Sequence, residues 1–236
     1  MDQHACHRLL SAACAGALFM GGCATAPVGI GFAPLAPSAA KPVLARMAAS
    51  TSGWEVVRFA FDITAVVPAD RAIQTLRAQA QCAWQPGTAL RVRISKFGVT
   101  AMDLLYVSNL WYLTDEVAER VYVCDRVDLL RVGTIPPVFF HEMQQLPQGW
   151  WQARYDGETT LSESPTAYRL EERAPHVIRT LEIEKTGMVP YSMSLQADDG
   201  VSFSAAFTRV DTNVTRSPAL FAPQLTGYTV RDLRKK

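Results

Sequence analysis

His141 and Glu142 stand together in a stretch with helical patterning, and such a pair opens the His-Glu-x-x-His motif of zinc proteases. The motif needs a second histidine one helical turn later, because two imidazoles on one helix face share the metal. Gln145 occupies that position. Ser164 and His176 could belong to a hydrolase triad, but no nucleophile-elbow motif, phosphate loop or dinucleotide fingerprint accompanies them. We therefore expect no catalytic residue, metal site or cofactor, and no enzyme activity.

Cys23 is the residue whose chemistry the sequence indicates most directly. It follows an apolar run from Leu9 to Met20 and the small pair Gly21-Gly22. The run is shorter than the ~20 residues of a membrane-spanning helix and typical of a secretory signal. The segment 18–23 resembles a bacterial lipobox, whose cysteine is acylated and becomes the mature N-terminus. The alternative is an ordinary signal peptide with an incidental cysteine.

These features divide the chain into three segments. Residues 1–22 are the expected signal peptide, and 23–42 are the lipidated cysteine and an Ala/Pro-rich tether with a single charge, Lys41. Residues 43–236 form the expected folded domain. Ala24 stands where inner-membrane retention signals of lipoproteins have Asp, which favours the outer membrane, facing the periplasm of a bacterium.

The charge of the chain is nearly balanced, with 23 Lys and Arg against 22 Asp and Glu and a net charge of +1. Such a surface has no long-range attraction for nucleic acid or anionic lipid. Attachment to the membrane would then come from acyl chains on Cys23.

Cys82 and Cys124 are the cysteines left after the signal and the anchor are set aside. A disulfide between them is one interpretation in an oxidising compartment. Two buried thiols in apolar strands are the other, and the pattern favours them.

Alternating apolar residues predict an antiparallel sheet in two blocks. In the first block Leu90, Val92 and Ile94 alternate with polar residues, and further strands are predicted over 99–107, 110–114 and 120–124. The second block contains five strands, predicted over 159–162, 168–173, 177–184, 191–196 and 201–210.

Helices are predicted between and before these blocks. One or two short helices are predicted within 43–64, and further helical segments over 127–130 and 137–145. Strands, a helical insertion and more strands indicate an α+β fold.

Aromatic side chains gather in the first block and beside the helical insertion. Most of them must be core residues. A strongly curved sheet would also leave an apolar pocket, which suits an acyl chain. The candidate lining residues are Trp84, Trp111, Leu130, Phe139 and Phe140.

Three short stretches resemble the periplasmic lipoprotein-localisation proteins LolA and LolB. Ser95-Lys96-Phe97-Gly98-Val99-Thr100, followed by Asp103-Leu104, resembles the receptor's membrane-inserting loop; Ser108 to Leu113 resembles a carrier hairpin; and Phe221 to Asp232 resembles the carrier's last strand. One departure is Gln85 before Pro86, where the carrier has an arginine that holds its lid closed. The chain therefore looks more like a membrane-tethered acceptor than a soluble carrier.

The resemblance implies a fold and a function. The fold would be an incomplete antiparallel β-barrel of about eleven strands, with helices covering its concave side. The function would be binding of lipid or acyl chains in a hydrophobic cavity, in lipoprotein or lipid localisation to the outer membrane. The partners would be phospholipid or the acyl chains of lipoproteins, the inner leaflet of the outer membrane and a periplasmic carrier protein. The alternative is a structural or accessory envelope lipoprotein, with a core filled by its own side chains and a protein partner.

Phe97 and Gly98 are the candidate membrane-inserting loop. Phe97 occupies the place of the receptor's exposed leucine, and Gly98 permits a tight turn that would project the ring outward. Without the resemblance, a buried loop phenylalanine would be the simpler interpretation.

Substituting Cys23 tests the lipid anchor. In cells supplied with a labelled palmitate, we expect the wild-type chain to incorporate label and Cys23→Ala to incorporate none, because only this cysteine follows a lipobox. Cys14→Ala, within the apolar run, is the matched control and should label like the wild type. Labelling of Cys23→Ala would contradict the assignment.

Overall fold

The computed structural model describes residues 31–69, 72–127, 159–212, 214–215 and 217–235. The chain divides into two compact units, Met1–Gly31 and Phe32–Lys236. All described helices and strands belong to the second unit.

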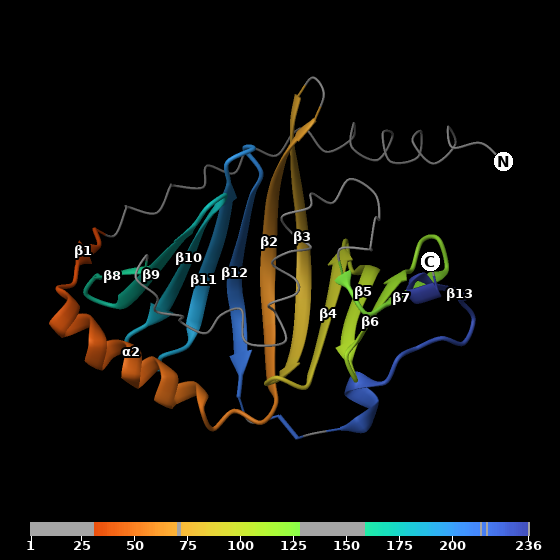
Figure 1. Cartoon of the computed structure of the whole chain (residues 1–236), viewed down its shortest axis with the longest axis horizontal. Coiled ribbons are helices and arrows are strands. Elements are labelled where there is room, and N and C mark those ends of the chain that lie inside the picture. Colours follow the sequence, from red (N-terminus) through yellow and green to blue (C-terminus); the bar gives the residue numbers. More distant parts are fainter. Residues whose placement is uncertain (1–30, 70–71, 128–158, 213, 216, 236) are drawn as a thin grey trace. The chain divides into compact units, whose positions relative to one another are not determined.

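In this unit thirteen strands form one sheet, in the order β1-β8-β9-β10-β11-β12-β2-β3-β4-β5-β6-β7-β13 (Figure 1). The strands are β1 (Ala33–Pro34), β2 (Val57–Ala69), β3 (Ala72–Gln85), β4 (Ala89–Lys96), β5 (Val99–Val107), β6 (Leu110–Asp115), β7 (Arg120–Cys124), β8 (Thr159–Glu163), β9 (Ala167–Ala174), β10 (Val177–Glu184), β11 (Pro190–Ala197), β12 (Ser202–Asp211) and β13 (Thr229–Asp232). Short 3-10 turns follow at η3 (Pro218–Phe221) and η4 (Leu233–Lys235).

Two antiparallel meanders build this sheet. Strands β2 to β7 form one, and β8 to β12 form the other. They join where β12 pairs with β2, from Ser202 opposite Val66 to Asp211 opposite Arg58. The C-terminal strand β13 adds to β7 in parallel, with Thr229 opposite Arg120.

Helix α2 (Pro37–Thr51) packs on one face of the sheet, here called the α2 face. Pro37 stands in its first turn, where a missing N–H has no intrahelical acceptor to lose. Ala40 and Met47 of the helix join a core cluster that includes Phe59, Trp84 and Leu104 of the sheet.

The opposite face of the sheet, here called the η3 face, is covered over β3 to β5 by the C-terminal segment. Ala83, Ala89 and Leu105 form a smaller buried cluster there with Phe221 of η3. Two separate covers are needed because successive side chains of a strand point to opposite faces.

The strands predicted from alternation are confirmed as β4 to β7 and β8 to β12. In the described residues the protein is mostly β, with α2 as the one α-helix and thirteen strands. The count of about eleven strands and the helices over the concave side are thus not confirmed. The helical segments 127–130 and 137–145 fall almost wholly outside the described residues.

The helix prediction over 43–64 is wrong in its second half. Trp54, Val57, Ala60 and Phe61 fit helical spacing, but the chain from Val57 is strand β2. Val57, Phe59 and Phe61 are the buried set, which is a period of two. Residues Ala33–Pro34 pair with β8, and α2 begins at Pro37, so this part of the predicted tether belongs to the folded unit.

Cys82 and Cys124 are both buried and no disulfide joins them, as the sequence favoured. Burial raises the pKa of the Cys82 thiol far above its ordinary value. The reactive thiolate is therefore absent at neutral pH in the folded protein.

Alkylation of Cys82 should accordingly require unfolding. We expect iodoacetamide to leave the Cys82 peptide unmodified at pH 8 in native protein and to modify it fully in denaturant, as read by mass spectrometry of the digest. Raising the pH to 9 should still leave Cys82 of the native protein unlabelled, since burial raises the pKa of this thiol above that pH. Labelling at the rate of a free thiol would show that Cys82 is accessible.

Candidate functional site

Three turns of the first meander bring exposed apolar side chains to one end of the sheet, which we call the hairpin end. Lys96 of β4 pairs with Val99 of β5 across the first turn. Gln79 pairs with Ser95, and β3 extends from Gln79 back to Ala72, so Leu76 and Ile73 lie on the β2–β3 hairpin, farther out than the β4–β5 turn. The β6–β7 turn joins them, since the Glu116 N–H donates to the Ala101 carbonyl at 3.2 Å. The hairpin end comprises Ile73, Leu76, Phe97, Val99 and Val117, all exposed.

Phe97 is the most exposed of these side chains, at 87%. It forms the two-residue β4–β5 turn with Gly98, and the backbone φ angles are 53° and 78°. Positive φ at both central positions is the type I′ geometry, which Asn and Gly favour and a bulky side chain resists. A phenylalanine held there, pointing into solvent, suggests a role other than making the turn. The alternative of a buried loop phenylalanine is thereby excluded.

Lys96 lies beside the exposed ring. Its Nζ is 5.4 Å from the centre of the Phe97 ring, within range of a cation–π contact. A cationic head next to an apolar ring is the composition found where side chains meet the interface of a membrane.

The predicted cavity residues that the structure describes lie on the α2 face. Trp84 and Trp111 are both buried in the core cluster. Trp54 packs edge-on to Trp84 with ring centres 6.4 Å apart. The ring centres of Tyr106 and Trp111 lie 4.9 Å apart. Leu130, Phe139 and Phe140, and the lipidation candidate Cys23, lie outside the described residues, so the cavity and the anchor stay predictions.

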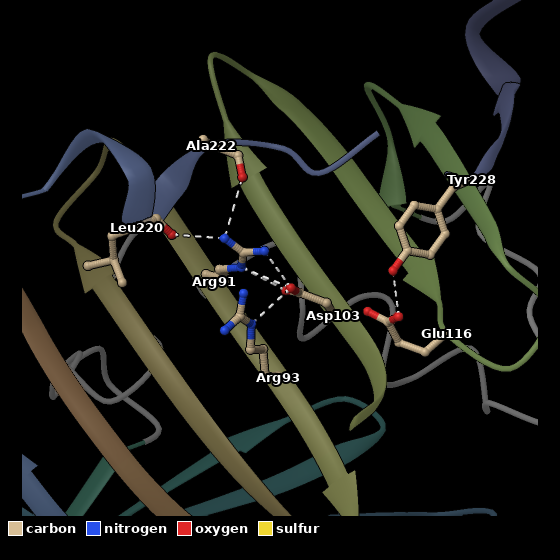
Figure 2. Close-up of polar contacts among 7 residues, drawn as sticks. All are labelled: Arg91, Arg93, Asp103, Glu116, Leu220, Ala222 and Tyr228. Carbon is tan, nitrogen blue, oxygen red and sulfur yellow. Dashed lines mark hydrogen bonds and ion pairs between the residues drawn. The ribbon is translucent and has the colours of Figure 1, made fainter. Parts of the chain in front are cut away.

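A buried ion pair ties the sheet to the C-terminal segment, and sequence reasoning missed it (Figure 2). Arg91 Nη2 lies 2.6 Å from Asp103 Oδ2, with side chains 7% and 5% exposed. Arg91 Nε donates to both carboxylate oxygens, at 3.0 and 2.9 Å. Its Nη1 donates to the carbonyls of Leu220 and Ala222, at 3.2 and 3.4 Å. The one available signal was a lone carboxylate inside the apolar strand 99–107.

Arg93 extends this network, and a separate hydrogen bond holds Tyr228 to the sheet. Arg93 Nε donates to Asp103 Oδ2 at 3.0 Å, so one carboxylate serves two guanidinium groups. The Tyr228 hydroxyl donates to Glu116 Oε2 at 2.6 Å (Figure 2). That hydrogen bond to a carboxylate raises the pKa of Tyr228, because ionisation would break it. The segment before β13 is thus fixed to the sheet at η3 and at Tyr228.

Among the residues that the structure describes, no group of three or more His, Cys, Asp or Glu side chains is placed so that it could hold a metal ion. The same residues include no helix of the length and apolarity that crossing a bilayer requires.

No model of a known protein family matches the chain, and no curated protein matches it in sequence. Solved structures do resemble it. An uncharacterized conserved protein from Thermus thermophilus has a TM-score of 0.50 at 12% identity, covering 82% of this chain and 98% of that one. That likeness concerns the fold alone.

Two other solved structures are similar at lower scores. LolA superfamily protein NE2245 from Nitrosomonas europaea has a TM-score of 0.40 at 10% identity, covering 78% of this chain and 97% of that one. A putative outer membrane lipoprotein-sorting protein domain from Vibrio parahaemolyticus has a TM-score of 0.42 at 9% identity, covering 76% and 94%. A protein of the LolA superfamily and a lipoprotein-sorting domain are thus among the solved structures that this chain is similar to.

Removing Asp103 should destabilise the protein strongly. Asp103→Ala leaves the buried Arg91 guanidinium unpaired, and we expect the free energy of unfolding to fall by about 3 kcal/mol or more in urea denaturation. The double variant Arg91→Met/Asp103→Leu should recover most of that loss, since no buried charge remains.

Asp62→Ala is the matched control for Asp103→Ala. Asp62 lies on the same face of the sheet but is exposed, and its loss should change stability by less than about 0.5 kcal/mol. An equally small effect at Asp103 would show that the buried pair is not structural.

Proposed function

We propose that this protein is an outer-membrane-anchored, periplasm-facing lipoprotein that binds lipid or acyl chains and acts, without catalysis, in localising lipoproteins or lipids to the outer membrane. The observation that carries the proposal is the exposed Phe97 in its strained turn, at the end of the sheet where four other apolar side chains are also exposed. A phenylalanine that a turn holds in solvent is available for contact with a membrane or a partner.

The arrangement of the hairpin end fits a bilayer interface. The turns present separate apolar tips instead of one flat patch, so each can enter between lipid headgroups while the backbone stays outside the hydrocarbon. Lys96 can meet lipid phosphate beside the ring. The acyl chains proposed for Cys23 would hold the protein at the membrane, and the phenylalanine would orient this end toward it.

The acyl-chain ligand is proposed from the aromatic side chains of the α2 face and from the LolA resemblance. Candidate cargo is phospholipid or the acyl part of a lipoprotein received from a periplasmic carrier protein. Full burial of Trp84 against Trp54 favours the alternative of a structural envelope lipoprotein with a filled core. Native mass spectrometry of residues 24–236 separates the two, because a lipid carrier should retain phospholipid or fatty-acid mass and a structural protein should retain none.

Changing Phe97 tests the membrane contact. In the anchor-free domain of residues 24–236, Phe97→Glu should weaken binding to phosphatidylethanolamine/phosphatidylglycerol vesicles about tenfold or more, since inserting a phenylalanine is worth about 2 kcal/mol. Phe97→Asn should weaken vesicle binding similarly and raise the unfolding free energy by about 1 kcal/mol, because Asn suits the positive φ. Flotation assays and thermal unfolding give the two readouts.

Ser108→Phe is the matched control for position. Ser108 and Asn109 form the β5–β6 turn with φ angles of 52° and 61°, the same turn geometry at the other end of β5, roughly 30 Å away. The double variant Phe97→Ser/Ser108→Phe moves the aromatic ring to the opposite end of β5 and should not restore vesicle binding. Restored binding, or a large stability loss in Phe97→Glu, would refute the membrane role of the hairpin end.

A further inference from the structure

A pocket of about 580 Å³ lies on the η3 face, away from the hairpin end. Its floor is formed by β12, β2, β3 and β4, and residues 217–220 of the C-terminal segment form one wall. The strand register places four residues of the floor side by side. Arg209 lies opposite Ala60, Ala60 opposite Gln81, and Gln81 opposite Arg93. The small side chains of Ala60 and Ala83 leave the space open above the sheet.

Four arginines line this pocket, namely Arg58, Arg91, Arg93 and Arg209. Among the residues that the structure describes, the acidic groups that line this pocket or bind its arginines are Asp211, in the lining, and Asp103, which holds Arg91 and Arg93. Four positive charges against two negative ones leave an excess of two at a concave site. This excess contrasts with the near-neutral chain as a whole.

Three of the four guanidinium groups keep donors available for a ligand. Arg58 is exposed and makes no ion pair with any residue that the structure describes. Arg93 uses only Nε toward Asp103, and its side chain is 43% exposed. Arg209 reaches Asp211 at 3.4 Å with a side chain 75% exposed, so that contact is weak and solvated. Arg91 is instead held fully by Asp103 and the C-terminal carbonyls.

We propose that this pocket binds the phosphate group of a phosphomonoester. Arg58 from β2, Arg93 from β4 and Arg209 from β12 would each offer a planar pair of donors from a different direction, which suits the three terminal oxygens of a tetrahedral anion. A planar carboxylate is satisfied by one such pair. The dianion of a phosphomonoester also matches the excess of two positive charges, and Gln81 adds a neutral amide donor on the floor.

The Arg91–Asp103 pair would position this site without binding the ligand. It fixes β4 to Leu220 and Ala222 of the C-terminal segment, whose residues Ser217, Ala219 and Leu220 line the pocket. Arg93 shares the same carboxylate, so its guanidinium is oriented before the ligand arrives. The phosphate could belong to a lipid headgroup or to a water-soluble ester, and the chemistry of recognition is the same for both.

The test is isothermal titration calorimetry of the full chain in a zwitterionic detergent, with phenyl phosphate as the soluble probe and dihexanoyl phosphatidic acid as the headgroup probe. We expect saturable binding of at least one probe. The double variant Arg58→Gln/Arg209→Gln should bind about a hundredfold more weakly, because each arginine removed takes away one charge-assisted hydrogen-bonding group, worth about tenfold in affinity.

Arg77→Gln is the matched control. Arg77 is exposed on the same face of β3, opposite Thr64, and does not line the pocket, so its loss makes the same kind of charge change and should leave affinity within about twofold. Binding of phosphatidic acid alone would assign the site to a lipid headgroup, and equal binding of phenyl phosphate would assign it to soluble phosphomonoesters. No saturable binding, an equal loss in Arg77→Gln, or benzoate binding as tightly as phenyl phosphate would overturn the proposal. None of these outcomes depends on vesicle binding by Phe97.

Discussion

Successive side chains of a β-strand point to opposite faces of the sheet. In this protein one sheet of thirteen strands therefore has apolar side chains on both faces that must be covered. The α2 face has a large aromatic and aliphatic core under helix α2. The η3 face has a smaller apolar cluster, over which the C-terminal segment is laid. That segment approaches the sheet with polar backbone, and its carbonyls at Leu220 and Ala222 are satisfied by Arg91. The buried guanidinium in turn requires Asp103, because an unpaired charge at such depth is costly.

This division gives the two faces different chemistry. Aromatic packing on the α2 face provides the environment that an acyl chain would share, whereas the η3 face carries arginines and a pocket at its junction with the C-terminal segment. The ends of the strands form a third surface. There the turns expose Phe97 and its apolar neighbours, which the sheet itself has no need to expose. A lipid anchor, an apolar tip and a phosphate site would together suit a protein that handles amphipathic molecules at a membrane.

Two β-turns of the first meander share a backbone conformation but differ in what their side chains contact. Phe97-Gly98 and Ser108-Asn109 adopt closely similar positive φ values. Ser and Asn are ordinary residues for an exposed turn, and Asn109 also accepts a hydrogen bond from the Tyr106 hydroxyl at 3.0 Å. The Phe97 ring lies beside Lys96 and is 87% exposed, so a smaller side chain would serve the fold equally well.

The sequence by itself determined the strands whose alternation is unambiguous, such as Leu90, Val92 and Ile94, because a period of two fits no helix. It also indicated two buried thiols and singled out Phe97, though it left the burial of that ring open. It misassigned residues 57–64, since Val57, Ala60 and Phe61 fit a helical period as well as Val57, Phe59 and Phe61 fit a strand. Only pairing with β3 and β12 decided between them. The arginine pocket was invisible for the same reason: Arg58, Arg93 and Arg209 are distant in the chain, and only the register of β12, β2, β3 and β4 brings them to one face.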